Sequence, residues 1–177
     1  MIRRPPRSTL SSSSAASDVY KRQPFRWFFK LEAASGLVLL FAAIITSFLS
    51  VPITTASYTI WLSSIDMPTT LNLFIASLIH DWFNLGVTLF LLFLVGFFIA
   101  FLITFVIRKY FDVKLISEPF SYAIAGSTCI ALILILTVAL LFETQIIAGN
   151  RTSIGTLLHV IAGFAGGYFF GYFLKKM

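Results

Sequence analysis

Five polar side chains could form a functional site in a chain that is otherwise strongly apolar. They are His80, Asp81, Glu143, Arg151 and His159. His159 falls inside a long apolar segment. If that segment crosses a membrane, an ionisable group at such depth indicates a proton relay, a ligand contact or a substrate contact. The other interpretation, which we favour, is a neutral imidazole bonded to a backbone carbonyl of a neighbouring helix.

Glu143 and Arg151 flank the short loop that precedes the segment containing His159. Together with His80 and Asp81 they could line a polar vestibule on the outer face of a membrane. We favour a simpler role in which Glu143 and Arg151 lie at the interface, because exposed pairs contribute only about 0–1 kcal/mol. His80 and Asp81 are too few for a metal or acid/base site, and a solvated polar helix face accounts for them.

Motifs for enzymatic chemistry are absent from the sequence. It contains no glycine-rich phosphate loop, no nucleophile elbow, no thiol pair and no HExxH motif. Cys129 is the only cysteine, which excludes an internal disulfide and a multi-cysteine metal site. No apolar segment carries the pair of carboxylates expected of a cation-coupled transporter. We therefore predict a protein that is not an enzyme and that has no cofactor and no metal.

Four long apolar segments must position these side chains. Apolar residues make up 58% of the chain and charged residues 11%, against about 25% charged in a typical soluble domain. The segments cover residues 31–53, 85–107, 119–142 and 154–174. Each has about 21–24 residues, or roughly 32–36 Å of helix, which crosses a hydrocarbon layer of about 30 Å. The prediction is an all-α bundle of four transmembrane helices within a domain covering residues 24–177.

Nearly all Lys and Arg residues that flank these segments lie on one side. That side holds Arg26, Lys30, Arg108, Lys109, Lys114, Lys175 and Lys176, and the opposite side holds Arg151. Short basic loops stay in the cytoplasm. We therefore expect both termini to be cytoplasmic, in the inner membrane of a bacterium, with the lipid bilayer as the main partner.

Residues 54–84 are predicted to be external, with Pro52 ending the first span. Asp66, Pro68 and Thr69 form a helix-start signal. Apolar and polar residues beyond this point fall on opposite helical faces. The pattern predicts an external amphipathic helix, either lying on the membrane surface or extending the second span outward.

The last apolar segment has a periodic row of glycines. Gly155, Gly163, Gly167 and Gly171 are spaced by four residues, and His159 occupies the missing place. Small residues let helix backbones approach closely where the hydrophobic effect cannot drive association. We expect this row to be a helix-packing seam.

Residues 1–23 form a basic, Ser-rich tail whose composition predicts disorder. Five basic residues against Asp18 give the tail +4 of the total charge of +6, so the rest of the chain offers no argument for a nucleic-acid partner. An organelle-targeting peptide or a basic lipid-binding arm would be a biological explanation. The string resembles a translated sequencing-library adapter, and we expect it to be non-native.

Two further stretches resemble known membrane proteins. Residues 28–36, Phe-Phe-Lys-Leu-Glu-Ala-Ala-Ser-Gly, resemble the amino-terminal helix of NhaA-type sodium/proton antiporters, and residues 82–84 and 94–96 echo the next span of that family. Residues 97–105 are uncharged where the family has a charged motif, and its paired intramembrane aspartates have no counterpart. A complete antiporter is therefore excluded, which leaves a divergent antiporter-like fragment as an alternative.

The carboxyl half gives a different resemblance. Residues 148–152, Ala-Gly-Asn-Arg-Thr, precede an apolar segment with Ala162-Gly163 and Gly166-Gly167. This arrangement is similar to the end of small bacterial four-span inner-membrane proteins. That resemblance implies a family and no activity.

These observations predict a structural or accessory subunit that packs with itself or with another membrane protein through its glycine-rich last helix. The alternative is a small transporter or channel-like oligomer with an outward-facing polar entrance. The surroundings of His159 separate the two, because only an opening to an aqueous cavity supports transport.

Overall fold

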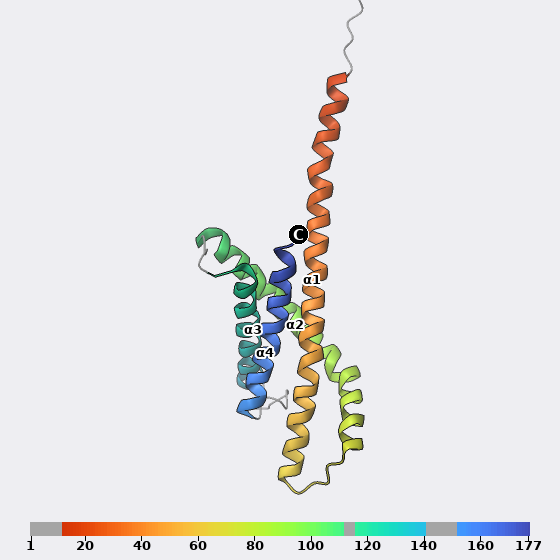
Figure 1. Ribbon diagram of the computed structural model, residues 1–177, viewed down its shortest axis with the longest axis vertical. Helices are drawn as coiled ribbons and strands as arrows, with labels where there is room; N and C mark the ends of the chain where they lie inside the picture. Colours follow the sequence, from red (N-terminus) through yellow and green to blue (C-terminus); the bar gives the residue numbers. More distant parts are fainter. Residues whose placement is uncertain (1–11, 112–115, 141–151) are drawn as a thin grey trace, which may run out of the picture. The chain divides into compact units, whose positions relative to one another are not determined.

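The computed structural model is helical, with no strand among the residues that it describes, which are 12–111, 116–140 and 152–177 (Figure 1). The helices are α1 (Ser12–Ser64), α2 (Leu71–Phe111), α3 (Glu118–Leu140) and α4 (Ser153–Leu174). Each contains a stretch long and apolar enough to cross a membrane. The all-α prediction with four apolar helices is confirmed.

The chain divides into two units, Met1–Gly36 and Leu37–Met177. In the first unit, α1 already begins at Ser12. Residues 12–23 belong to this helix, and residues 1–11 lie outside the described part. The predicted disorder of residues 1–23 stays a prediction. The second unit holds the remaining helices and all the contacts described below.

The prediction that Pro52 ends the first span is wrong, because α1 continues to Ser64. The apolar part of this helix therefore extends to Ser64, beyond the predicted end at residue 53. Proline lacks an N–H group, so the carbonyl of Phe48 loses its usual helical donor. Such interruptions are tolerated in membrane helices, where neighbouring hydroxyl groups and helices satisfy the backbone. A turn follows in which Asp66 takes a positive φ of 56°, a conformation that Asp tolerates better than most residues.

Helix α2 is a single helix of 41 residues that begins after Thr70, whose hydroxyl accepts a hydrogen bond from the N–H of Leu73. Its length is about 62 Å at 1.5 Å per residue, roughly twice the hydrocarbon thickness. Residues 71–84 are continuous with the rest of α2, so they are an extension of the second span and not a separate element. One face of α2 is buried, at Gly86, Leu89, Phe93, Phe97 and Phe101.

Helices α3 and α4 begin at the predicted places. Helix α3 starts at Glu118, directly after Ser117. Thr152 caps α4, and its hydroxyl accepts a hydrogen bond from the N–H of Gly155 over 3.0 Å. Both starts follow the preference for a hydroxyl residue at the position before a helix.

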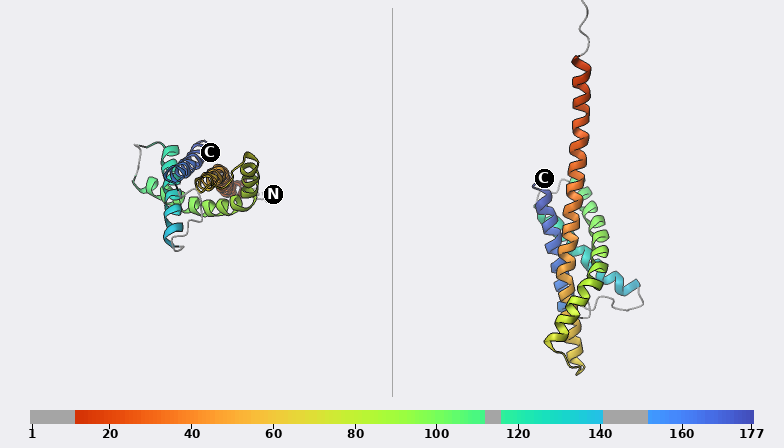
Figure 2. Two further views of the ribbon diagram at one scale, coloured as in Figure 1. Left: turned by 90° about the horizontal axis from the view of Figure 1, so that it is seen from below. Right: turned by 90° about the vertical axis from the view of Figure 1, so that its right-hand side faces the viewer.

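Within the second unit, α4 lies between α3 and the apolar part of α1 (Figures 1 and 2). Helix α2 contacts α1 with its first half and α3 with its second half. An aromatic cluster fills the core where α2, α3 and α4 meet. The ring of Phe101 stacks on Phe97 at 4.9 Å and on Phe170 at 4.5 Å, and Tyr122 meets Phe101 edge-on at 5.5 Å.

Candidate functional site

The apolar part of α1 carries a face of buried hydroxyl groups. Its members are Thr46, Ser47, Ser50, Thr54, Thr55 and Ser57, all with 7% exposure or less. Spacings of three and four residues place most of them on one side of a helix. This face approaches α4 through Thr46 and Thr54 and α2 through Ser47 and Thr55. Buried hydroxyls in a membrane helix bond across to neighbouring helices, so this face is the polar interface of the bundle.

His159 of α4 is fully buried against this face. Its Nδ1 lies 2.7 Å from the carbonyl oxygen of Gly155, one turn earlier in α4. Its Nε2 lies 3.1 Å from the Oγ1 atom of Thr54. A carbonyl oxygen can only accept, so Nδ1 donates and carries a proton. The predicted bond between the imidazole and a backbone carbonyl is present, although the carbonyl belongs to α4 itself and the neighbouring helix supplies a hydroxyl.

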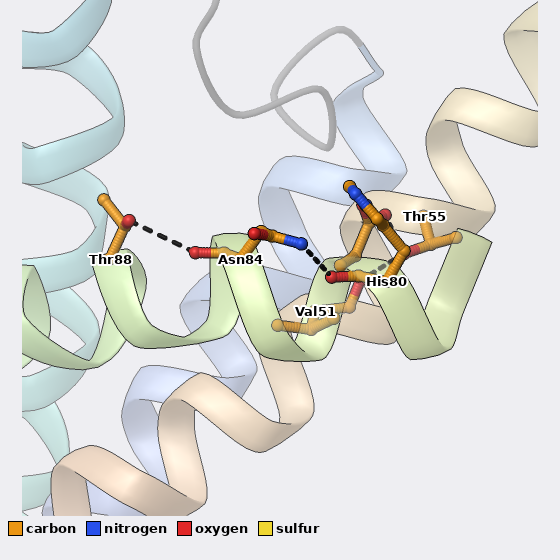
Figure 3. A network of polar contacts seen from close by, with 6 residues as sticks. Val51, Thr55, His80, Asn84 and Thr88 are labelled. Atoms are coloured by element: carbon orange, nitrogen blue, oxygen red, sulfur yellow. Dashed lines mark hydrogen bonds and ion pairs between the residues drawn. The ribbon is translucent and has the colours of Figure 1, made fainter. Parts of the chain in front are cut away.

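Asp81 of α2 contacts the same face of α1 at Thr55, the residue after Thr54. The hydroxyl of Thr55 lies 2.7 Å from Oδ2 of Asp81 and 3.1 Å from the carbonyl oxygen of Val51. The imidazole of His80 is exposed, and its Nδ1 lies 3.6 Å from Oδ1 of Asp81. On the same side of α2, the amide of Asn84 donates to the carbonyl of His80 over 2.9 Å (Figure 3). Asp81 therefore links the exposed side of α2, where His80 lies, to a buried hydroxyl group of α1.

The described residues do not form the open vestibule that the sequence suggests. His159 is enclosed and bonds to Thr54, whereas His80 is exposed and contacts Asp81. Glu143 and Arg151 lie outside the described residues. His159 is therefore enclosed between α4 and α1 in the described residues.

The glycine row of α4 faces α3. A methyl group added at Gly163 would lie 2.7 Å from the carbonyl oxygen of Gly126, and one at Gly167 would overlap the carbonyl of Tyr122. At Gly171 the nearest atom would be the Cα of Pro119, at 2.7 Å. These three glycines bring the backbones of α4 and α3 together within one chain.

Gly155 and Gly166 have different roles from the other glycines. The carbonyl of Gly155 is the partner of His159. Gly166 faces α1, where an added methyl group would overlap the hydroxyl of Thr46. Small residues therefore serve both neighbours of α4, and the side facing α1 is also the side that carries His159.

Sequence reasoning missed the hydroxyl face of α1. Pro52 was expected to end this span, although Thr46, Ser50 and Thr54 recur every four residues across that position. That spacing indicates a helix face rather than a loop. The partner of each hydroxyl could not be predicted, because it depends on which helix lies opposite.

An apolar groove of about 390 Å³ lies between α2 and α3. Small or polar residues that line it are Gly96, Ala100, Thr104, Ala125, Thr128 and Cys129. Gly96, Ala100 and Thr104 follow a four-residue spacing, which is typical of helix-contact faces in membranes. Within the part of the chain that the structure describes, no three His, Cys, Asp or Glu residues are grouped to hold a metal ion.

The fold defines the class as an all-helical protein whose described residues include four helices long and apolar enough to cross a membrane. No family model, no curated protein and no solved structure matches the chain.

Proposed function

We propose that this chain is a structural or accessory subunit of a bacterial inner membrane, with both termini in the cytoplasm. The orientation is supported by seven Lys and Arg residues at the inner ends of the helices against Arg151 outside. Reporter fusions after Tyr110 and Lys176 should be cytoplasmic, and fusions after Ser64 and Asn150 should be external. A carboxyl terminus found outside would reverse the orientation.

The observation that carries the structural role is the enclosure of His159. Both ring nitrogens are bonded within the chain, and the side chain has no exposed surface. A substrate path through this position would need water or an opening at the ring. The ring of His159 is instead enclosed by other parts of the described chain.

The surface for a partner is then expected on α2 and α3. The glycine row of α4 is covered by α3, so a second protein cannot use it while the chain keeps this packing. At Gly96 the α3 side chains of Cys129 and Ile133 already lie close. Beside Ala100 and Thr104 the groove has the small residues that a helix of another protein, or of a second copy, could approach. The first half of α2, residues 71–84, extends this surface outward as the amphipathic external part.

Filling the groove tests this role. Ala100→Phe places a large ring in the groove, whereas Val95→Phe places the same ring at a lipid-facing position of α2 with 60% exposure. We expect Ala100→Phe to abolish association, measured as mass in mild detergent and as recovery of co-purifying membrane proteins. Val95→Phe should associate like the unmodified chain. Equal association of the two variants would remove the groove as the contact surface.

A small transporter or channel-like oligomer is the second candidate, and the buried hydroxyl groups of α1 favour it. Such hydroxyls line ion and substrate paths in membrane proteins when they face water. The purified protein in liposomes separates the two roles. The structural role predicts that proton and cation leakage equals that of empty liposomes, and a saturable flux abolished by His159→Gln would establish the transporter.

A further inference from the structure

The hydroxyl of Thr54, which contacts His159, has two possible hydrogen-bond acceptors. The hydroxyl of Thr54 lies 3.1 Å from Nε2 of His159 and 3.0 Å from the carbonyl oxygen of Ser50. A hydroxyl group has one proton, so it donates to one of these two atoms at a time. The atom that does not receive this proton then needs another hydrogen-bond partner.

Each choice corresponds to one protonation state of the ring. With a neutral imidazole, Nδ1 donates to Gly155 and Nε2 accepts the proton of the Thr54 hydroxyl. With an imidazolium, Nδ1 still donates to Gly155, and Nε2 donates to the Thr54 oxygen. The Thr54 hydroxyl then donates to the carbonyl of Ser50, which can accept both this proton and its helical N–H partner.

We propose that His159 is a reversible proton-binding site and that Thr54 is its positioning residue. The proton is taken up by the lone pair of Nε2, and rotation of a single hydroxyl group restores every hydrogen bond. No helix has to move. This property goes beyond the structural role proposed above and does not depend on it.

The surrounding charges are compatible with such a site. Helix α1 has no acidic or basic side chain from Ala34 to Ser64 apart from the phenol of Tyr58. Gly171 of α4 contacts the α3 start at Glu118, so Glu118, Lys175 and Lys176 are at the end of the bundle away from His159. Arg108 of α2 bonds to Ser121 and lies at that same end.

At the end near His159, the charged groups of α2 are Asp81 and His80. Asp81 is held by Thr55, the residue that follows Thr54. Thr55 has the same two-acceptor geometry, because its hydroxyl lies between Oδ2 of Asp81 and the carbonyl of Val51. Consecutive threonines of α1 thus each join a titratable side chain to a backbone carbonyl of their own helix. A negative Asp81 would favour a positive charge on this side of the bundle.

Thr46 provides the matched control position. It is buried on the same face of α1, its hydroxyl donates to the carbonyl of Ala42 over 2.9 Å, and it contacts the Ala162 carbonyl of α4 at 3.5 Å. Both of its partners are carbonyl groups, which do not titrate. Thr46→Val therefore removes a hydroxyl from the same interface without touching a group that binds a proton.

The test is the nitrogen NMR titration of His159. The chain has two histidines, so His80→Gln leaves His159 as its one imidazole. In this parent, labelled at the imidazole nitrogens and held in nanodiscs from about pH 4 to about pH 9, Nε2 should gain a proton reversibly while Nδ1 stays protonated. Thr54→Val removes the oxygen that accepts from the imidazolium, which should weaken proton affinity about tenfold or more. Thr46→Val should titrate like the parent.

Several results would overturn the site. They are an imidazole that stays neutral throughout that range while the protein remains folded, a proton lost from Nδ1 instead of gained at Nε2, and an unchanged titration in Thr54→Val. If Thr54→Val fails to fold, the parent decides the question alone. A proton gained at Nε2 with Nδ1 still bonded would then support the site, and any other pattern would exclude it.

Discussion

Helix α4 has two interfaces, and they hold their neighbours by different means. On the α3 side, Gly163 and Gly167 bring backbone against backbone. On the α1 side, His159 meets the hydroxyl of Thr54. In a membrane neither interface can depend on the hydrophobic effect, because lipid is as apolar as the side chains. Backbone packing dominates the α3 side, whereas the α1 side combines hydrogen bonds with a close contact at Gly166, where an added methyl group would overlap the Thr46 hydroxyl.

The two interfaces should therefore fail for different reasons. A backbone contact has no space for an added atom, so an increase in side-chain size is the damaging change. A hydrogen-bonded contact keeps its shape when a hydroxyl is replaced by a methyl group, so the loss of a donor is the damaging change. Size should matter towards α3 and at Gly166, and polarity should matter most at the other contacts towards α1.

The largest effect is expected at Gly167. Gly167→Ala adds a methyl group that overlaps the carbonyl of Tyr122, and the helices must separate to accept it. We expect a loss of about 2–3 kcal/mol in the free energy of unfolding, measured by denaturation in mixed micelles. Gly167→Leu should prevent packing altogether while the chain still inserts, since Leu favours membrane insertion.

Gly36 is the control for this change. An added methyl group there meets no atom within 4 Å, so Gly36→Ala should be neutral or stabilise by up to about 1 kcal/mol. If Gly167→Ala behaved like Gly36→Ala, the glycine row would not be a close backbone contact.

The next effect is expected at Thr55. Thr55→Val removes the hydrogen bond to Asp81 at 2.7 Å and should cost about 1–2 kcal/mol, because one partner is a carboxyl group. A double-mutant cycle with Asp81→Ala should give a coupling energy of about 1 kcal/mol. Additive single effects would mean that the two side chains do not interact in the folded protein.

A smaller effect is expected at Thr46. Its contact with the carbonyl of Ala162 is long, at 3.5 Å, so Thr46→Val should cost about 0.6 kcal/mol, the average for such bonds between membrane helices. The same unfolding assay measures it. A loss as large as that of Gly167→Ala would show that both interfaces of α4 fail in the same way.

No effect is expected on the lipid-facing side of α2. Leu91 is 55% exposed and lies away from the buried face at Phe93 and Phe97. Leu91→Ile should change the free energy of unfolding by less than about 0.5 kcal/mol. A larger change would indicate a contact that this chain makes with itself or with a partner at Leu91.

Local chemistry made part of this fold predictable from the sequence. Thr152 marks the start of α4 because its hydroxyl satisfies a free N–H group of the first helical turn, and Ser117 stands at the same position before α3. The four-residue spacing of Gly163, Gly167 and Gly171 indicates a groove for another helix on the same physical grounds. These signals act within one or two turns of a single helix.

The errors concern information that is not local. Pro52 was expected to end the helix, as proline often does in water, but α1 continues past it. In a membrane, exposing further backbone groups in a loop would cost more than leaving one carbonyl group without its helical donor. For residues 71–84 the sequence left two alternatives, a helix on the membrane surface or an extension of the second span. No feature at Leu85 decides between them, and the structure has the extension. The partner of His159 depends on which helix packs against α4. The spacing of residues in α4 does not identify that helix, so Thr54 could not be predicted as the partner.

The central claim is that α4 packs against α3 of the same chain. Phe120 and Phe164 test it, because their rings meet edge-on with centroids 5.6 Å apart beside the glycine row. In a Cys129→Ala background, Phe120→Cys and Phe164→Cys are joined with a short thiol cross-linker after tagged and untagged chains have been mixed. The account predicts a cross-link within single chains, with unchanged yield on dilution. Cross-links mainly between tagged and untagged chains would contradict it, since α4 would then pack against a second molecule.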